Sequence, residues 1–452
     1  MLSRTLDALF RRNALKERLL RNFSISFAGS ASQLVLAMLL VPVLTKNLSI
    51  ADYGRIIIVG NFFSFFSQVI RVRVNDLIYR FLPSFEDQND HKGIAALLRL
   101  SLAVSVGVCA VIFLLLLVGG KWLTLTIYRD PALHPLLMLQ MVSGALLPLE
   151  EFSMAILRIK DRFSWLVVPQ TVGIATTVAL TVFLIYAIED TNLLFIIGAM
   201  VIGQLIGILL PFVASLTLSW KAISVPVGRF WWRVLAPHRA AMWSTIIQTN
   251  LINYLKLGAR DGGIFLLGIL APPEQVALYG MAIKLTRPLD ILQNNLQQAL
   301  NPEIAELYGK RQFLNLHTLA RNVIIATTFF GGVATLVMLI VAKPVILLLT
   351  TQDFLGALPV FRLLVLARYI TMISMPVFYV TLCMGELKRR NLVVASRFLF
   401  IGAFILTGLN ALTLAIAQLL GALVVRIFSD IPVMRRLRSL AATEQETNVE
   451  KG

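Results

Sequence analysis

Long apolar runs, each about twenty residues in length, recur along the whole chain and are separated by short polar segments. A helix needs about this length to cross a hydrocarbon core about 30 Å thick. Backbone polar groups must be satisfied inside lipid, so unbroken apolar runs predict helices, whereas a β-barrel would show alternation. The pattern predicts an all-α integral membrane protein with about twelve transmembrane helices. The predicted spans are 23–45, 54–80, 100–119, 132–157, 164–187, 192–218, 247–270, 279–301, 322–342, 357–385, 392–409 and 412–432.

Two of these spans carry polar side chains on a single helical stripe. In the second span the stripe consists of Asn61, Ser64, Gln68, Arg71 and Asn75. In the eighth span it consists of Arg287, Asp290, Asn294, Gln297, Gln298 and Asn301. Lipid does not solvate such stripes, so we expect both to line a water-filled space inside the protein.

Basic residues outnumber acidic ones inside the predicted spans. The basic ones are Arg55, Arg71, Arg73, Arg80, Lys256, Arg260, Lys284, Arg287, Arg362, Arg368, Arg397 and Arg426. The acidic ones are Asp76, Glu150, Glu151, Asp261, Asp290 and Asp430. Each charge costs at least about 2.5–3.5 kcal/mol near the bilayer centre, so complete pairing would still leave a costly positive surplus. That surplus predicts an anionic substrate.

Some of these charges have a structural explanation close by in the sequence. Snorkelling to the membrane surface accounts for Arg55, Arg80 and Arg362, which lie near span ends. Local neutralisation is also possible, because one helical turn separates opposite charges at several places. The pairs are Asp76 with Arg73 or Arg80, Asp290 with Arg287, Asp430 with Arg426, Asp261 with Lys256 or Arg260, and Glu150 or Glu151 with Arg158. Glu150 and Glu151 could instead cap a kink at Pro148.

Composition agrees with a membrane protein: 58% of the residues are hydrophobic and only 14% are charged, against about 25% charged in soluble domains. The formal net charge is +17. Most of that excess falls in short loops, where membrane topology explains it better than nucleic-acid binding does. Both cysteines, Cys109 and Cys383, lie in apolar runs, so we expect neither a disulfide nor a metal site, and the sequence indicates no cofactor and no catalytic group.

The loops on one side of the membrane are poor in positive charge. They contain only Lys46, Lys121, Arg129 and Lys343, whereas the side shared by both termini holds dense clusters such as Arg158 to Arg162. Positive loops stay cytoplasmic. We therefore expect both termini in the cytoplasm and an even number of spans.

Short motifs recur in the same order in the two halves. Tyr53-Gly54 matches Tyr279-Gly280, Pro148 matches Pro376, and Gln204 matches Gln418 with their neighbours. The repeat predicts two six-helix bundles related by a pseudo-twofold axis, with a central cavity and alternating access. The predicted divisions are a cytoplasmic amphipathic segment (1–22), an N-terminal bundle (23–218), an interfacial linker (219–246), a C-terminal bundle (247–432) and a cytoplasmic tail (433–452).

The cationic cavity is the candidate substrate site. Arginine offers paired donors to the oxygens of a diphosphate, and Asn or Gln side chains suit sugar hydroxyls. The candidate residues are Arg71, Arg73, Asn75, Lys256, Arg260, Lys284, Arg287, Asn294, Arg368, Arg397 and Arg426.

Several motifs resemble those of a known family. They are Leu48 to Gly54, Arg80-Phe-Leu-Pro83, Tyr279-Gly280, Leu300-Asn-Pro-Glu-Ile304, and Arg260-Asp261 before Gly262-Gly263. Together with the duplicated layout they resemble the polysaccharide and O-antigen flippases of the multidrug/oligosaccharidyl-lipid/polysaccharide (MOP) exporter superfamily. The resemblance implies a MATE-like fold and transfer of an undecaprenyl-diphosphate-linked repeat unit from the cytoplasmic to the periplasmic leaflet, driven by an ion gradient. Implied partners are the polyprenyl-diphosphate-linked glycan, membrane lipids and polysaccharide polymerase or chain-length machinery.

The coupling group and the rival functions stay open at this point. Asp76, Asp261 and Asp290 are the candidate ion-coupling carboxylates. A MATE-like drug exporter would be expected to have an acidic cavity, and a membrane-embedded polysaccharide polymerase would be expected to have a long catalytic loop outside the membrane. The peptidoglycan-precursor branch of the superfamily typically has two further spans.

Overall fold

The computed structural model describes the whole chain except residues 1, 71–73, 227–230, 245, 248–249, 251–261, 385–386 and 451–452. Within the described residues every regular element is helical and there are no strands. Nine of the described helical segments are long and apolar enough to cross a membrane. The prediction of an all-α membrane protein is confirmed. The number of spans stays a prediction, because most of the seventh span (247–270) lies outside the described residues.

The chain forms two compact units. Unit 1 consists of residues Met1–Val43 and Phe62–Tyr254, and unit 2 consists of Leu44–Asn61 and Leu255–Gly452. Unit 2 thus includes the end of the first helix and the first half of the second helix. This packing boundary differs from the repeat boundary predicted near the linker, because a repeat records sequence duplication whereas a unit records which segments pack together.

The first helix, α1 (Leu2–Asn47), begins in unit 1 and ends in unit 2. The second helix begins in unit 2 and ends in unit 1. The helix α1 is continuous, so no break separates the predicted surface segment 1–22 from the first span. The predicted second span, 54–80, contains two helices, α2 (Ile50–Ile70) and α3 (Val74–Asp87). The remaining elements of unit 1 are α4 (His91–Trp122), η1 (Leu123–Ile127), α5 (Leu133–Gly144), α6 (Leu147–Ile159), α7 (Ser164–Tyr186), α8 (Leu193–Ile223) and η2 (Trp231–His238).

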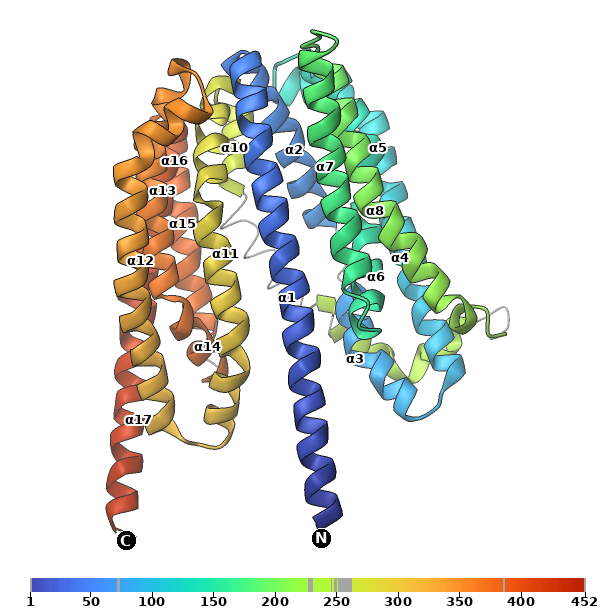
Figure 1. Cartoon of the computed structure of the whole chain (residues 1–452), viewed down its shortest axis with the longest axis vertical. Coiled ribbons are helices and arrows are strands. Elements are labelled where there is room, and N and C mark those ends of the chain that lie inside the picture. The colour runs from blue at the N-terminus through green and yellow to red at the C-terminus, as the bar shows by residue number, and fades with distance from the viewer. Residues whose placement is uncertain are drawn as a thin grey trace. The chain divides into compact units, whose positions relative to one another are not determined.

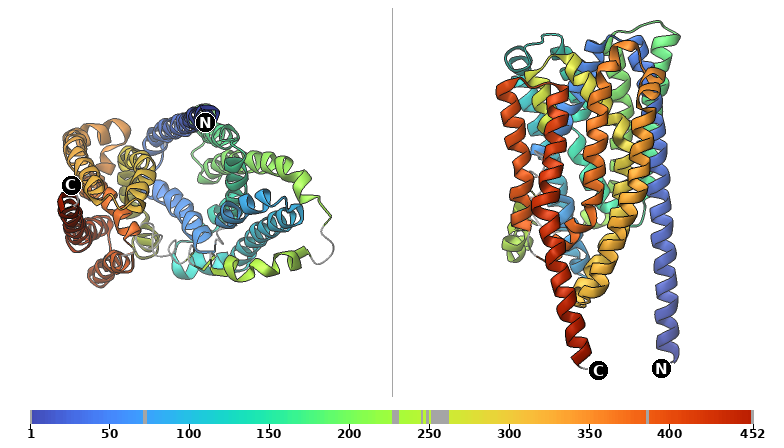
Figure 2. Two further views of the ribbon diagram at one scale, coloured as in Figure 1. Left: turned by 90° about the horizontal axis from the view of Figure 1, so that it is seen from below. Right: turned by 90° about the vertical axis from the view of Figure 1, so that its left-hand side faces the viewer.

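The other elements of unit 2 follow the linker and run roughly along one another (Figures 1 and 2). They are α10 (Gly262–Leu270), α11 (Pro273–Gly309), α12 (Phe313–Leu349), η3 (Gln352–Gly356), α13 (Ala357–Ile373), α14 (Met375–Cys383), α15 (Leu387–Thr407), α16 (Ala411–Val425), η4 (Arg426–Asp430) and α17 (Ile431–Glu450). Helix α13 packs against α11, α12 and α16 and therefore lies at the centre of this group.

The two repeats show the same interruption. In unit 1 helix α5 ends at Gly144 and α6 begins at Leu147, with Pro148 in its first turn. In unit 2 helix α13 ends at Ile373 and α14 begins at Met375, just before Pro376. Proline is tolerated in the first turn of a helix, where its missing N–H has no intrahelical partner, and it disrupts a helix interior. The shared break supports the duplication predicted from the sequence.

Close helix packing in unit 1 depends on small residues. A Cβ atom added at Gly173 of α7 would collide with the carbonyl oxygen of Gly203 on α8, and one added at Gly203 would collide with the Thr177 hydroxyl. Glycines at such crossings let two backbones approach closely inside a membrane. Helices α7 and α8 therefore form one tightly packed pair.

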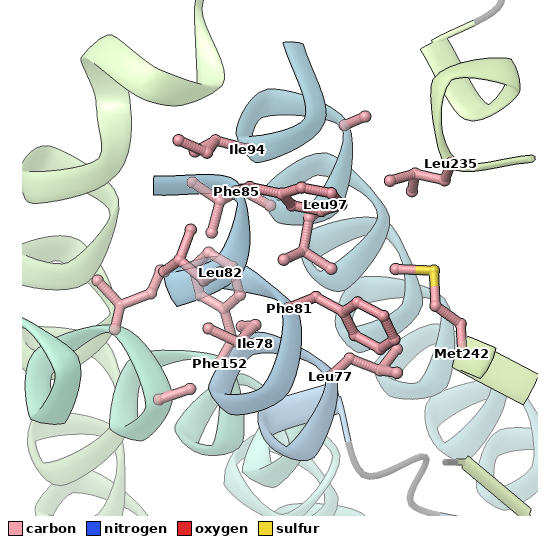
Figure 3. Packing of buried hydrophobic residues seen from close by; sticks show 14 residues of the cluster. Leu77, Ile78, Phe81, Leu82, Phe85, Ile94, Leu97, Phe152, Leu235 and Met242 are labelled. Carbon is pink, nitrogen blue, oxygen red and sulfur yellow. The ribbon is translucent and has the colours of Figure 1, made fainter. Parts of the chain in front are cut away.

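A second core of unit 1 joins α3, α4 and α6 to the linker. Leu77 and Phe81 of α3, Leu97 of α4 and Phe152 of α6 are buried together with Leu235 and Met242 (Figure 3). The last two residues come from the connection between the predicted halves. That connection is therefore packed onto unit 1.

Candidate functional site

The described part of the candidate site lies in unit 2, where α2 and α11 cross at the two repeated Tyr-Gly pairs. A Cβ atom at Gly54 would collide with the backbone of Pro273, which begins α11, and a Cβ atom at Gly280 would lie 2.6 Å from Cδ1 of Ile57. Glycine is required at position 54 because the backbone of Pro273 leaves no room for a side chain, whereas at Gly280 a larger residue would displace the Ile57 side chain. The crossing explains why the Tyr-Gly pair recurs in both halves.

Lys284 on α11 is held at this crossing by Tyr53 on α2. Its ammonium group donates a hydrogen bond of 3.1 Å to the Tyr53 hydroxyl and lies 4.9 Å from the centre of the Tyr53 ring. The ring is fully buried and packs edge-on against Phe354 of η3, with 5.5 Å between ring centroids. A buried aromatic ring thus holds a half-exposed cation through both a hydrogen bond and a cation–π contact.

Tyr53 was not among the predicted site residues. Its contact with Lys284 joins positions 231 residues apart, which no local spacing rule detects. The sequence signals for Tyr53 were its place in the repeated Tyr-Gly pair and in the motif Leu48 to Gly54.

Arg287 lies one turn after Lys284 on α11 and is exposed. Neither side chain has a carboxylate partner within the part of the chain that the structure describes. An ammonium group has three donors, and only one is used by Tyr53, while a guanidinium group offers five. Lys284 and Arg287 therefore provide two adjacent cations with donors left for an anion.

Asp290 and Arg368 form an ion pair between α11 and α13. The Arg368 Nε atom lies 3.3 Å from Asp290 Oδ1, and the two side chains are 28% and 30% exposed. The sequence pointed to Arg287 as the partner of Asp290 because the two are three residues apart. In the structure an arginine from a neighbouring helix takes this place, so Arg368 is partly neutralised by Asp290.

Arg426 and Asp430 form the pair predicted from their spacing. They lie in η4, one π-helical turn, with Arg426 Nη1 4.0 Å from Asp430 Oδ2. Asp430 is fully buried whereas Arg426 is 26% exposed. Single π-turns are frequent at functional sites. The turn joins α16 directly to α17, so the pair lies within one continuous helical segment.

Charged residues elsewhere have partners that the sequence did not single out. Arg55 pairs with Asp52 at 2.9 Å, one turn earlier on α2. Glu150 in the first turn of α6 accepts a hydrogen bond of 2.7 Å from Gln170 of α7. Asp76, one of the candidate coupling carboxylates, is half-buried near the start of α3.

Several predicted site residues cannot be placed. Arg71, Arg73, Lys256, Arg260 and Asp261 lie outside the described residues. Asn75, Asn294 and Arg397 are in described helices, α3, α11 and α15, but their side chains are outside the description. Their roles stay predictions, as does the cavity expected between the two halves. In the described part of the chain, no group of three or more His, Cys, Asp or Glu side chains is placed to hold a metal ion.

Comparison with known proteins identifies the family. A family model described as polysaccharide biosynthesis protein matches residues 19–308, which is more than half of the chain. The chain belongs to the polysaccharide biosynthesis protein family. A second model, described as MatE, matches residues 263–389. No curated protein sequence matches the chain.

Solved structures share the fold at low sequence identity. An inward-facing multidrug resistance MATE family transporter of the MOP superfamily is 14% identical, with a TM-score of 0.70 over 91% of this chain and 96% of that one. The lipid II flippase MurJ in an inward closed conformation is 14% identical, with a TM-score of 0.66 over 93% and 90%. A MOP superfamily transporter from Pyrococcus furiosus is 15% identical, with a TM-score of 0.63 over 94% and 96%.

These comparisons confirm the resemblance drawn from the sequence motifs. This member of the polysaccharide biosynthesis protein family is a multi-pass membrane protein with the MATE-like fold of MOP superfamily transporters.

Proposed function

We propose that this protein is a flippase that moves an undecaprenyl-diphosphate-linked oligosaccharide repeat unit from the cytoplasmic to the periplasmic leaflet. The product would be used to build a surface polysaccharide such as O-antigen or exopolysaccharide. Family membership supports a role in polysaccharide biosynthesis, and the fold is shared with the lipid II flippase MurJ. The proposed location is the inner membrane, with both termini cytoplasmic, where polysaccharide polymerase or chain-length machinery would take up the flipped glycan.

The observation that carries the proposal is the pair of cations on α11. Lys284 and Arg287 lie one turn apart, and neither has a carboxylate partner among the described residues. A positive charge without a partner is costly inside a membrane protein. An anionic cargo that binds there would remove this cost, so the arrangement favours a diphosphate over a cationic drug.

The chemistry at this pair fits a diphosphate. The Arg287 guanidinium group can donate two parallel hydrogen bonds to phosphate oxygens. The Lys284 ammonium group, fixed by Tyr53, directs its other protons to the same anion. Neutralisation of the cations would let the two halves close and reopen on the other side, as alternating access requires. Asp76, Asp261 and Asp290 remain the candidates for coupling to an ion gradient. Of these, Asp290 also forms an ion pair with Arg368.

The proposal is tested in a strain from which the gene is deleted. We expect the deletion to accumulate a lipid-linked glycan that faces the cytoplasm and to lose its surface polysaccharide. Lys284→Gln and Arg287→Gln should each lower restored surface polysaccharide about tenfold, which corresponds to ~1.4 kcal/mol of lost stabilisation. Arg287→Lys should restore part of it, because the charge remains while the paired donors are lost.

A matched control is Lys343→Gln, an exposed lysine of α12 in the same unit and outside the proposed site. It should restore surface polysaccharide like the wild type. Normal complementation by both Lys284→Gln and Arg287→Gln, at wild-type protein levels, would remove the assigned site. A deletion strain without any accumulated lipid-linked glycan would remove the flippase assignment itself.

A small-molecule exporter is the second candidate. The MatE model over residues 263–389 and the likeness to multidrug transporters favour it. The structure from Pyrococcus furiosus is described as having a binding pocket of reverse polarity that suggests a different function, so pocket polarity is the feature to compare. An exporter predicts increased sensitivity of the deletion strain to cationic drugs with normal surface polysaccharide. A polymerase, the third candidate, predicts shortened chains instead of an accumulated single repeat unit.

A further inference from the structure

The connection between the two halves has one face that is fixed to unit 1. Arg99 of α4 donates hydrogen bonds to the carbonyl oxygens of Ile223, at 2.8 Å, and Val225, at 2.9 Å, where α8 ends and the connection begins. Further along, Leu235 and Met242 are buried against α3 and α4 (Figure 3). These contacts hold the connection against the body of unit 1.

His238 completes this buried face. Its ring lies 5.2 Å from that of Phe85 and 6.2 Å from that of Phe81, centroid to centroid. The buried or half-buried positions 235, 238, 242 and 246 follow a helical spacing of three, four and four residues. The described residues 231–238 form a 3-10 helix and residues 239–244 continue as an α-helix.

The opposite face of the connection is apolar as well, although it is exposed. Trp232, Trp243 and Ile247 are 51%, 55% and 61% exposed. Arg239, Trp243 and Ile247 are spaced four residues apart along the α-helical part, so they share one side of it, and Trp232 is exposed in the 3-10 helix that precedes it. The side of an amphipathic helix that faces water carries polar residues. Two tryptophans and an isoleucine at these positions indicate that something other than water covers this face.

The charged residues indicate what contacts this exposed face. From Lys221 to Asn250 the chain contains no Asp or Glu, whereas it contains Lys221, Arg229, Arg233 and Arg239. Arg233 and Arg239 are exposed beside the tryptophans. Tryptophan is enriched where a membrane meets water, and positive residues near that boundary attract anionic lipid headgroups. A surface that binds a water-soluble protein does not need to be rich in tryptophan and to have only positive residues among its charged ones.

We propose that the linker face, formed by Trp232, Arg233, Arg239, Trp243 and Ile247, lies in the membrane surface and binds anionic phospholipid headgroups. The tryptophan and isoleucine side chains enter the boundary between headgroups and acyl chains. The two arginines donate hydrogen bonds to lipid phosphates. Because the buried face is fixed to α3 and α4, the bound lipid anchors unit 1 at this level of the bilayer. The inference does not depend on which cargo the protein carries.

Lipid preference tests the arginines. The full-length protein is reconstituted in vesicles of phosphatidylcholine with and without phosphatidylglycerol, and the ratio of the two lipids that remain bound after detergent extraction is measured by native mass spectrometry. We expect Arg233→Gln with Arg239→Gln to lower the preference for phosphatidylglycerol about tenfold. The matched control is Lys121→Gln with Arg129→Gln, two exposed cations of unit 1 in the η1 region, which should change it less than about twofold.

Fluorescence tests the depth of the tryptophans. The wild type and a Trp232→Phe, Trp243→Phe variant are compared in vesicles whose acyl chains are brominated close to the carbonyl groups. We expect strong quenching of the emission that the wild type has and the variant lacks. The proposal would be overturned if the Arg233/Arg239 and Lys121/Arg129 substitutions changed lipid preference equally. It would also be overturned if the brominated lipids did not quench the emission of Trp232 and Trp243. Unchanged thermal unfolding of both exposed variants shows that a loss of lipid preference is not a loss of fold.

Discussion

At the scale of single residues, cations in unit 2 are held by groups from other helices. Tyr53 of α2 holds Lys284 of α11, and Asp290 of α11 pairs with Arg368 of α13. Local spacing predicted the pair within one turn that Arg426 forms with Asp430, but it pointed to Arg287 as the partner of Asp290, which pairs with Arg368. A helix surface brings residues three or four apart together, whereas a partner on another helix is set by how the helices cross.

Tyr53→Phe should lower transport without loss of fold. The variant keeps the ring, its edge-on contact with Phe354 and the cation–π contact, and it loses the hydrogen bond to Lys284. Such a bond to a partly exposed charged group contributes about 1 kcal/mol, so we expect about a fivefold lower flipping rate in reconstituted vesicles. Tyr53→Leu should lower the rate further, because it also removes the ring.

A double substitution distinguishes positioning of Lys284 by Tyr53 from a role of Tyr53 in packing alone. In a Lys284→Gln background, Tyr53→Phe should have almost no additional effect on transport, since the interaction that it removes is already gone. If the two substitutions lower transport independently, then Tyr53 does not act by positioning Lys284.

At the scale of helices, equivalent elements of the two repeats share their breaks and not all of their contacts. Gln204 of α8 is an example. Its side-chain oxygen accepts hydrogen bonds from Gln140, at 2.6 Å, and Ser143, at 2.7 Å, both on α5. Gln418 of α16 matches Gln204 in the repeat and is half-buried, but no side-chain hydrogen bond joins it to the described residues. Among the described residues, the glutamine of the repeat therefore joins two helices in unit 1 and does not in unit 2.

Gln204→Leu should destabilise unit 1 by about 1–2 kcal/mol, because it removes the acceptor that Gln140 and Ser143 share and leaves them only the longer bonds of 3.4 and 3.3 Å to one another. Thermal unfolding in a mild detergent measures the loss. The control is Gln418→Leu, which should change the free energy of unfolding by less than about 0.5 kcal/mol. An equal loss in both variants would show that these hydrogen bonds do not stabilise α5 against α8.

At the scale of the whole molecule, packing and duplication divide the chain at different places. Residues Leu44–Asn61 belong to unit 2 by packing, although the sequence repeat assigns them to the first half. These residues contact unit 2 where α2 crosses α11: Gly54 lies against the backbone of Pro273, and Gly280 lies against the Ile57 side chain. The net charge of +17 is a property of the same scale, because its placement in loops sets the orientation in the membrane.

Reporter fusions test that orientation. Alkaline phosphatase fused after Arg129 should be active, because this loop is predicted to be periplasmic, whereas a green fluorescent protein fused after Gly452 should fluoresce in the cytoplasm. Fusions after Lys160 should be inactive as phosphatase. Phosphatase activity at the C-terminus would contradict the predicted orientation.

The membrane class and the helical fold followed from the sequence alone. A bilayer leaves an apolar run of about twenty residues only one way to satisfy its backbone, so each span is specified locally. The motifs also sufficed to indicate the family, which the comparison confirmed. Only the tertiary structure decided that Tyr53 holds Lys284, that Arg368 pairs with Asp290, and that Leu235 and Met242 bury the connection against unit 1. Those contacts join distant positions, 231 residues apart in the first case, and depend on how helices cross, which no local pattern encodes.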